Sequence, residues 1–512
     1  MNMNRSEVIH KGLKSGKYVI ILRSLSQAAT LIVTVLLVRA LSETQFGIYN
    51  LLYSVIPLLS VIASFGLTNT LQRYIPEYYS KGEYQVANNL YRIASLIRLL
   101  SNIVILGLFL FFWNIIAPLF KLGEYRNYFI LFTLVVFLYM QRELLETCLT
   151  SYFLHKYTQA LTLIFAVIKA LGYAFVILME MDLWTVISID LSAHIFIFIT
   201  LQIIYGKKVP HKTDKSATIL KEEKKRLLRY SMYYNLNDAG VGLLGGRFDN
   251  FIIVMYMTPA AVGAYSFCLR ISEMIERILP LNYFIGILRP AFFSLGMDLD
   301  RQHVNKFYQA LVKTTYLFHA PILVFLFMFG TEMINVLFEG KFMTFWWILF
   351  LIFLFKTINA FTVPVSLVAQ LNERADIILY SKIFAAYNIF ADIILIKHFG
   401  VLGAVLATGT AHFGKNIFIW YFVRKDATFK GMGTFFMTLT GYWIVFSGGL
   451  FILKSVCSGQ ILLLCAGTFV IIVGVILQCK LKILIPRELG LLAKHIENPF
   501  FNKISGWLFK DW

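Results

Sequence analysis

Long, uninterrupted runs of apolar residues dominate the sequence, and they restrict the possible folds more than any other feature. An α-helix needs about 20 residues to cross the hydrocarbon core of a bilayer, and fourteen runs reach roughly that length. Hydrophobic residues make up 58% of the 512 residues, whereas charged residues make up 15%. A spanning sheet would have to close into a barrel and alternate apolar with polar residues, which these runs do not do. We therefore predict an all-α polytopic membrane protein.

The predicted spans follow one another along most of the chain. We expect no cleavable signal peptide, because the first run is longer than a signal core and leads directly into further spans. The spans cover residues 18–38, 46–66, 93–116, 128–148, 157–179, 184–205, 231–256, 262–285, 307–329, 343–369, 377–396, 401–423, 434–453 and 460–479.

The distribution of basic residues predicts the orientation of these spans. The formal net charge is +19, and thirty of the 47 Lys and Arg residues fall in segments on the side of the amino terminus. Only six fall in the opposite loops. By the positive-inside rule, both termini are predicted to be cytoplasmic. Nucleic-acid binding would need a large soluble basic surface, and we predict none.

Two stretches of the chain resemble each other at an offset of 216 residues. FGIY (46–49) aligns with VGAY (262–265), and RYIP (73–76) aligns with RPAF (289–292). This offset holds six predicted helices, an even number, so both copies enter the membrane from the same side and form a parallel repeat. We therefore predict an N-terminal lobe (1–206), a basic cytoplasmic linker (207–230), a C-terminal lobe (231–424), and two further helices with a cytoplasmic tail (425–512).

Eleven Lys and Arg residues fall inside the predicted spans, where each costs about 3 kcal/mol if it faces lipid. Five lie within two turns of a cytoplasmic end, from which a long side chain can extend to the interface: Arg23, Arg98, Arg142, Lys382 and Lys415. Four lie deeper, namely Lys169, Arg247, Arg270 and Lys356, with Lys313 next. A cationic, water-filled cavity favours a phosphate or pyrophosphate ligand, which Arg can hold bidentately.

The two spans that begin the second copy also carry acids. Asp238 and Asp249 share a face of span 231–256 with glycines, so either is a candidate proton or sodium site. In span 262–285, Arg270, Glu273 and Arg277 fall at i, i+3 and i+7 on one face. This stripe either binds a ligand, with Glu273 as a candidate ion-coupling residue, or forms ion pairs that join helices.

Several chemistries are not expected. The five cysteines form no CxxC or Cys/His pattern, so we predict no metal site or cofactor. No Walker A motif is present, so ATP is not expected to drive the protein directly. A membrane enzyme would need a sizeable outer loop, and the predicted outer loops are short. The one DxD motif, residues 298–300, falls in a predicted cytoplasmic loop and is interpreted as a solvated turn.

Six segments carry a resemblance to a known family: LS (41–42) with FGIYNLL (46–52), FGL (65–67), QRYIPE (72–77), RFDNFII (247–253) and VGAYSFCLRISEMI (262–275). The chain resembles the polysaccharide exporters and O-antigen flippases of the multidrug/oligosaccharidyl-lipid/polysaccharide (MOP) superfamily. The resemblance implies a two-lobed bundle in a bacterial-type cytoplasmic (inner) membrane. Related peptidoglycan-precursor flippases use cavity arginines on their first and eighth helices, which by position implies Arg23 and Arg270 here.

This resemblance implies a flippase that moves an undecaprenyl-pyrophosphate-linked oligosaccharide across the membrane by alternating access, not an enzyme. The expected partners are the lipid-linked oligosaccharide of O-antigen, lipopolysaccharide or other polysaccharide biosynthesis, membrane lipids, H⁺ or Na⁺, and polysaccharide polymerase machinery. The expected substrate-binding residues are Arg270, Arg247, Lys169, Lys356, Lys313 and Arg23, and the expected ion-coupling residues are Asp249, Asp238 and Glu273. Two alternatives remain: a cation-coupled drug or metabolite antiporter of the same superfamily, and a membrane glycosyltransferase or polymerase.

Overall fold

The computed structural model consists of α-helices joined by short turns, and the described residues contain no β-strand. The described residues are 5–210, 225–232, 235, 246–279, 301–456 and 459–481. Their contacts divide the chain into two compact units, Met1–Ser266 and Phe267–Trp512, and each unit is described separately.

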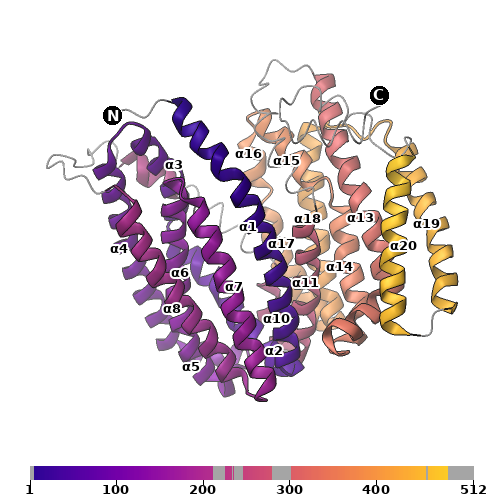
Figure 1. Ribbon diagram of the computed structural model, residues 1–512, viewed down its shortest axis with the longest axis horizontal. Helices are drawn as coiled ribbons and strands as arrows, with labels where there is room; N and C mark the ends of the chain where they lie inside the picture. Colours follow the sequence, from indigo (N-terminus) through magenta and orange to yellow (C-terminus); the bar gives the residue numbers. More distant parts are fainter. Residues whose placement is uncertain are drawn as a thin grey trace. The chain divides into compact units, whose positions relative to one another are not determined.

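The first unit is a bundle of long helices, drawn from indigo to magenta in Figure 1. Neighbouring helices in the sequence are joined by turns of a few residues, so most of them run antiparallel to the next. Its helices are α1 (Arg5–Ala40), α2 (Glu43–Ser64), α3 (Leu67–Ser80), α4 (Tyr84–Phe111), α5 (Trp113–Leu119), α6 (Arg126–Ser151), α7 (His155–Leu178), α8 (Leu183–Lys208), α10 (Asp249–Tyr256) and the first part of α11 (Pro259–Ile278).

Local sequence fixes the ends of α2. Ser42 caps its amino terminus, because its side chain accepts from the Gln45 amide while the Gln45 side chain accepts from the Ser42 amide. At the other end, Phe65 (φ 44°) and Gly66 (φ 66°) adopt left-handed conformations that break the chain between α2 and α3. Gly66 is required there, since a Cβ atom would lie 2.0 Å from the Ser231 carbonyl oxygen. The residues after this break form the amphipathic α3.

The second unit contains the rest of α11 and a further set of helices. A short 3₁₀ turn, Met343–Phe345, precedes α14, and a break at residues 359–361 separates α14 from α15. The helices are α13 (Arg301–Phe338), α14 (Trp346–Ile358), α15 (Thr362–Leu371), α16 (Ala375–Tyr380), α17 (Ile383–Phe399), α18 (Val401–Val423), α19 (Gly433–Val456) and α20 (Gln460–Lys480).

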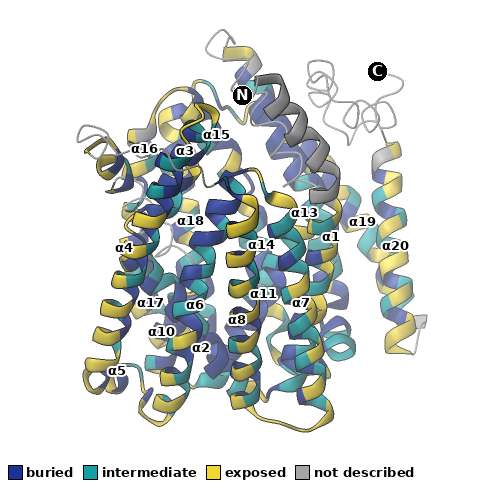
Figure 2. Cartoon of the chain, turned by 60° about the vertical axis from the view of Figure 1, so that its left-hand side comes forward, coloured by how far each residue is buried: buried dark blue, intermediate teal, exposed yellow. Residues whose placement is uncertain are grey.

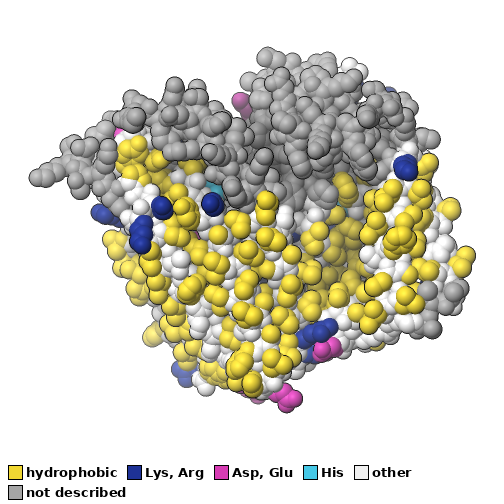
Figure 3. Space-filling view, in the orientation of Figure 1, with side chains coloured by type: hydrophobic (Ala, Val, Ile, Leu, Met, Phe, Trp, Pro, Cys, Tyr) yellow, Lys and Arg dark blue, Asp and Glu magenta, His cyan; other side chains and the backbone are white. Residues whose placement is uncertain are grey.

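Apolar side chains lie on the outer faces of the helices as well as between them. Figure 2 shows exposed residues along α4, α8 and α20, and many of these are large and apolar, such as Leu100 on α4 and Ile199 on α8. Hydrophobic side chains cover most of the described surface in Figure 3, while Lys and Arg appear mainly toward its upper and lower margins. A soluble protein rarely exposes so much contiguous apolar surface, whereas a bilayer favours it.

The predicted fold class is confirmed. Within the described part of the chain, ten helices or helix pairs are long and apolar enough to cross a membrane, and eleven if the bent α2–α3 pair counts as one. The span predicted at 401–423 is the helix α18, and the span predicted at 262–285 overlaps α11. Of the span predicted at 231–256, the residues 236–245 lie outside the described residues. The protein is therefore a polytopic, multi-pass membrane protein.

Candidate functional site

A buried ion pair joins α7 and α8 in the first unit. Lys169 on α7 places its Nζ 2.9 Å from Oδ1 of Asp190 on α8. The Lys169 residue is 7% exposed, and Asp190 is fully buried. Two unpaired charges at this depth would each be costly, so the pair explains how α7 and α8 can pack together here.

Three tyrosine hydroxyls complete the surroundings of the Asp190 carboxylate. Tyr49 and Tyr53 on α2 donate to Oδ2 at 2.8 and 2.5 Å, and Tyr173 on α7 donates to Oδ1 at 2.6 Å. The Lys169 ammonium also lies 5.4–5.5 Å from the ring centroids of Tyr53 and Tyr173. The carboxylate is thus held by four donors from two helices, which makes the cluster a well-satisfied polar network.

Sequence reasoning singled out Lys169 as a substrate contact but did not identify this cluster. The available signal was the spacing of its members, because Tyr49 and Tyr53, like Lys169 and Tyr173, are four residues apart on one helix face. In the structure Lys169 forms an ion pair with Asp190, so a phosphate would have to compete with that carboxylate to bind the ammonium.

A second cationic group adjoins the first across the ring of Phe165. The Arg142 guanidinium lies 4.2 Å from the centroid of this ring, and the Lys169 ammonium lies 5.4 Å from it. Arg142 Nε also pairs with Glu146 at 2.8 Å, and its Nη1 lies 3.5 Å from Nδ1 of the buried His194. These contacts link α6, α7 and α8 into one polar interior.

Arg98 on α4 does not extend to the interface as expected, because its side chain is fully buried. Its Nη2 donates to Thr68 Oγ1 at 3.3 Å and lies 3.9 Å from Glu143. Its Nε and Nη1 have no hydrogen-bond partner among the described residues. The distance to the interface along the helix, which was the basis of the expectation, gives no information about the direction of the side chain.

Around α10, the structure places two of the predicted site residues. Asp249 is fully buried and accepts a hydrogen bond from the Tyr265 hydroxyl. Arg247 is exposed in the turn before the helix. The adjacent Asn250 donates to Ser54 Oγ at 2.8 Å, so α10 is fixed to α2 by a buried polar contact. Asp238 lies outside the described residues.

In the second unit, the predicted stripe on α11 is partly paired. Arg270 is half-buried, and Glu273 pairs with the more exposed Arg277 at 3.6 Å. Lys356 on α14 pairs with Glu276 on α11 at 2.7 Å, which joins these two helices. An ion pair that joins two helices, as in the alternative interpretation, is therefore formed by Glu276 and Lys356.

The two remaining predicted cations differ in exposure. Lys313 on α13 is 9% exposed, and its ammonium lies 5.7 Å from the ring centroid of Phe435 on α19. Arg23 on α1 is exposed. Lys313 thus belongs to the interior of the second unit, whereas Arg23 lies on the surface of its helix.

Buried polar side chains lie on α17 and α18 in the second unit. Asn388, Asp392 and Asn416 are all fully buried, and Asn388 Nδ2 donates to Asp392 Oδ2 at 3.2 Å. The Oδ1 atoms of Asn388 and Asn416 have no hydrogen-bond partner in the part of the chain that the structure describes. Carboxylate and amide oxygens are ligands that hard cations prefer. The sequence signal for the Asn388–Asp392 contact was their i, i+4 spacing within an apolar span.

Comparisons with known proteins agree with the fold. The profile of a family described as "Polysaccharide biosynthesis protein" matches residues 13–295. An uncharacterized membrane protein of Methanocaldococcus jannaschii is 22% identical over 416 residues, which cover 77% of this chain and 80% of that protein.

Two solved structures are similar to the chain over most of their length. The lipid II flippase MurJ in an inward closed conformation has a TM-score of 0.67 at 14% identity, covering 90% of this chain and 97% of that one. An inward-facing multidrug resistance MATE family transporter of the MOP superfamily has a TM-score of 0.62 at 14% identity, covering 79% and 98%. At these identities the likeness is one of fold.

Proposed function

The chain belongs to the polysaccharide biosynthesis protein family, and from this premise we propose that it flips an undecaprenyl-pyrophosphate-linked oligosaccharide from the cytoplasmic to the outer leaflet by alternating access. The proposed setting is a bacterial-type cytoplasmic membrane with both termini in the cytoplasm. The observation that carries the proposal is the half-buried Arg270 on α11, a cation that directly follows the uncharged run 259–269 of this helix. Its chemistry suits a pyrophosphate.

The substrate is proposed to contact cations from several helices in turn. Arg270 and Arg247 come first, because one is half-buried in α11 and the other is exposed beside α10. Lys356 and Lys313 extend the positive charge of the second unit, and Lys169 and Arg23 that of the first. Lys169 acts through its exchangeable pairing with Asp190. The sugar follows the pyrophosphate while the prenyl chain stays in lipid.

The driving force is proposed to come from an ion gradient of H⁺ or Na⁺. Asp249, Asp238 and Glu273 are the acids chosen from the sequence, and the buried Asp249 is the best placed of the described two. The buried pair of Asn388 and Asp392 on α17 adds a second candidate in the other unit. The Asn388 amide oxygen, which has no hydrogen-bond partner among the described residues, is suited to a small hard cation.

A cation-coupled drug or metabolite antiporter is the second candidate function, favoured by the MATE-like fold. The MATE transporter structure covers 79% of this chain, whereas the structure of the lipid II flippase covers 90%. The structural likeness to the lipid II flippase therefore covers more of the chain than the likeness to the MATE transporter, which favours a lipid-linked substrate. The two solved structures of similar fold are described as a flippase and a transporter, which favours transport over glycosyl transfer. A polysaccharide polymerase is then a proposed partner.

Complementation tests the proposal in cells that lack the native protein. We expect Arg270→Ala and Arg247→Ala each to lower surface glycan to less than a tenth of the wild-type amount. Arg301→Ala is the matched control, because Arg301 is exposed at the start of α13 and pairs with Asp426 at 3.3 Å. Normal export with both site variants would overturn the proposal.

A further inference from the structure

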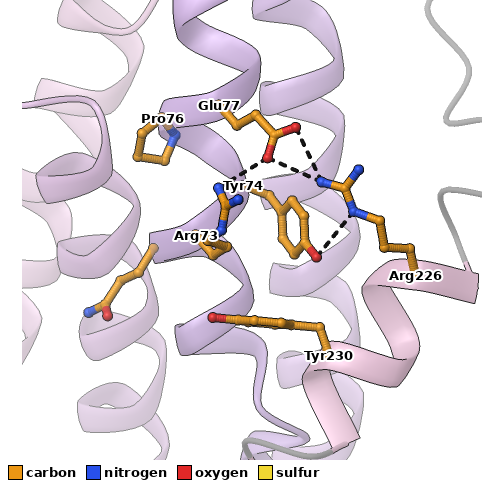
Figure 4. Close-up of a pocket in the computed structure, with 7 residues that line it drawn as sticks. Arg73, Tyr74, Pro76, Glu77, Arg226 and Tyr230 are labelled. Atoms are coloured by element: carbon orange, nitrogen blue, oxygen red, sulfur yellow. Dashed lines mark hydrogen bonds and ion pairs between the residues drawn. The ribbon is translucent and has the colours of Figure 1, made fainter. Parts of the chain in front are cut away.

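An open pocket of about 950 Å³ lies in the first unit, where a helical segment of residues 225–232, here called the linker helix, packs against α3 (Figure 4). The positive-inside rule places both elements on the cytoplasmic side. The residues that line the pocket are Gln72, Arg73, Tyr74, Pro76, Glu77, Arg226 and Tyr230.

One carboxylate in this region faces three cations. Glu77 lies 3.1 Å from Arg73 Nη1 and 3.1 Å from Lys81 Nζ. Arg226 Nη2 donates to both carboxylate oxygens, at 3.2 and 3.1 Å. The side chains of these three cations are 51–55% exposed. The group therefore carries a surplus of positive charge that remains accessible to solvent.

Aromatic rings hold the two pocket arginines in place. The guanidinium of Arg226 lies 4.8 Å from the ring centroid of Tyr74, and that of Arg73 lies 5.6 Å from it. Tyr230 packs edge-on against Tyr74 at 5.4 Å. Nη1 of Arg226 and Nε and Nη2 of Arg73 have no hydrogen-bond partner among the described residues. The pocket thus offers positioned donors to an anion.

The linker helix also carries exposed apolar side chains. Leu228 is 63% exposed and Met232 is 67% exposed, close in sequence to Arg226 and Arg229. A short helix that combines basic residues with exposed apolar ones is typical of the membrane interface. Basic side chains at that depth are attracted to the anionic lipids of the cytoplasmic leaflet.

We propose that this pocket binds the phosphate of an anionic phospholipid from the cytoplasmic leaflet. The phosphate takes hydrogen bonds from Arg73 and Arg226, because guanidinium groups bind phosphate bidentately. It competes with Glu77 for these donors. Leu228 and Met232 contact the acyl chains of the same lipid layer.

Hydrogen bonds connect the end of the linker helix to the break between α2 and α3. Just beyond the pocket residues of the linker helix, Ser231 Oγ donates to the Phe65 carbonyl oxygen, and Asn235 Oδ1 accepts from Ser64 Oγ at 2.6 Å. A phosphate held by both Arg73 and Arg226 therefore joins α3 to a segment that is tied directly to this break. The lipid composition of the inner leaflet would in this way set how firmly the linker helix holds α3.

Native mass spectrometry of the full-length protein, titrated with phosphatidylglycerol, tests the site. We expect Arg226→Gln and Arg73→Gln each to weaken binding about fivefold, equivalent to about 1 kcal/mol per basic side chain. Lys81→Gln is the matched control, because Lys81 has the same partner and the same charge but does not line the pocket. It should change binding less than twofold. Glu77→Gln removes the competing carboxylate and should strengthen binding.

The other outcomes separate the alternatives. Equal losses in Arg226→Gln, Arg73→Gln and Lys81→Gln would indicate general surface attraction and overturn the site. Equally tight binding of phosphatidylcholine would remove the requirement for an anionic lipid. Displacement of phosphatidylglycerol by inorganic phosphate at equal concentration would identify a soluble occupant instead of a lipid. Circular dichroism and melting curves verify that each variant is folded, and none of these outcomes depends on whether the protein flips a glycan.

Discussion

Gly47 and Gly263, which occupy the same place in the aligned motifs FGIY and VGAY, approach each other so closely that a Cβ atom on Gly47 would lie 3.2 Å from the Gly263 nitrogen. The same atom would lie 1.7 Å from the Pro259 carbonyl oxygen. The backbones of α2 and α11 are therefore in direct contact, which only glycine allows. Tyr49 and Tyr265, aligned in the same motifs, each donate to a buried aspartate.

This contact predicts that Gly47→Ala destabilises the protein. The added methyl group meets backbone atoms that cannot rotate away, so we expect a loss of about 1–3 kcal/mol of stability. Thermal unfolding of the purified protein in detergent measures it. Gly107→Ala on α4 is the control, since a Cβ atom there meets nothing within 4 Å. An unchanged melting temperature for Gly47→Ala would contradict the close approach.

The buried pair of Lys169 and Asp190 predicts a strong coupling between the two side chains. Lys169→Met leaves the Asp190 charge without its cation, and we expect a loss of about 3–5 kcal/mol. The double variant Lys169→Met with Asp190→Asn should recover most of that loss, because neither charge remains. A double-mutant cycle on unfolding in detergent measures the coupling. Additive effects of the two changes would show that the pair is not formed.

The contact between Glu77 and the linker helix should depend on pH. Burial raises the pKa of its carboxyl, but hydrogen bonds from Lys81 and Arg226 outweigh this and hold the pKa below its ordinary value. A lowered pKa means that the contact contributes fully above about pH 4.3, the ordinary value for Glu, and is lost as the pH falls through the folded-state pKa. We therefore expect the amides of residues 225–232 to lose protection from hydrogen exchange in acid, after correction for the intrinsic exchange rate at each pH.

Glu77→Gln provides the control for that titration. The uncharged amide cannot form the ion pairs at any pH, so exchange in residues 225–232 should be high at neutral pH and should not change further in acid. Equal protection of the wild-type protein and Glu77→Gln at neutral pH would show that the carboxylate does not hold the linker helix.

If the buried Asn388 and Asp392 on α17 bind a small cation, that cation should stabilise the protein. A ligand at ten times its Kd adds about 1.4 kcal/mol to the free energy of unfolding, so Na⁺ or H⁺ should raise the melting temperature of the wild-type protein. Asp392→Asn should abolish the rise, whereas Asp376→Asn should keep it, because Asp376 is exposed and pairs with Arg374. Equal Na⁺ and pH responses in wild type and Asp392→Asn would count against this site.

Hydropathy predicted the helices well because the bilayer requires long apolar runs, as α7 and α18 illustrate. It did not predict the break of α14 from α15, since both segments are apolar. It also could not pair Lys169 with Asp190, which lie 21 residues apart on different helices. Charge pairing depends on how each helix is rotated about its axis. The same limit explains Arg98, whose side chain is buried between helices.

The most direct test of the central proposal is translocation of a fluorescent undecaprenyl-pyrophosphate oligosaccharide by the purified protein in liposomes. Loss of one charge-assisted phosphate contact costs about 1.5–3 kcal/mol, so we expect Arg270→Ala to slow translocation at least tenfold while Arg301→Ala keeps the wild-type rate. Translocation by the wild-type protein no faster than in protein-free liposomes, or an undiminished rate with Arg270→Ala, would contradict the account.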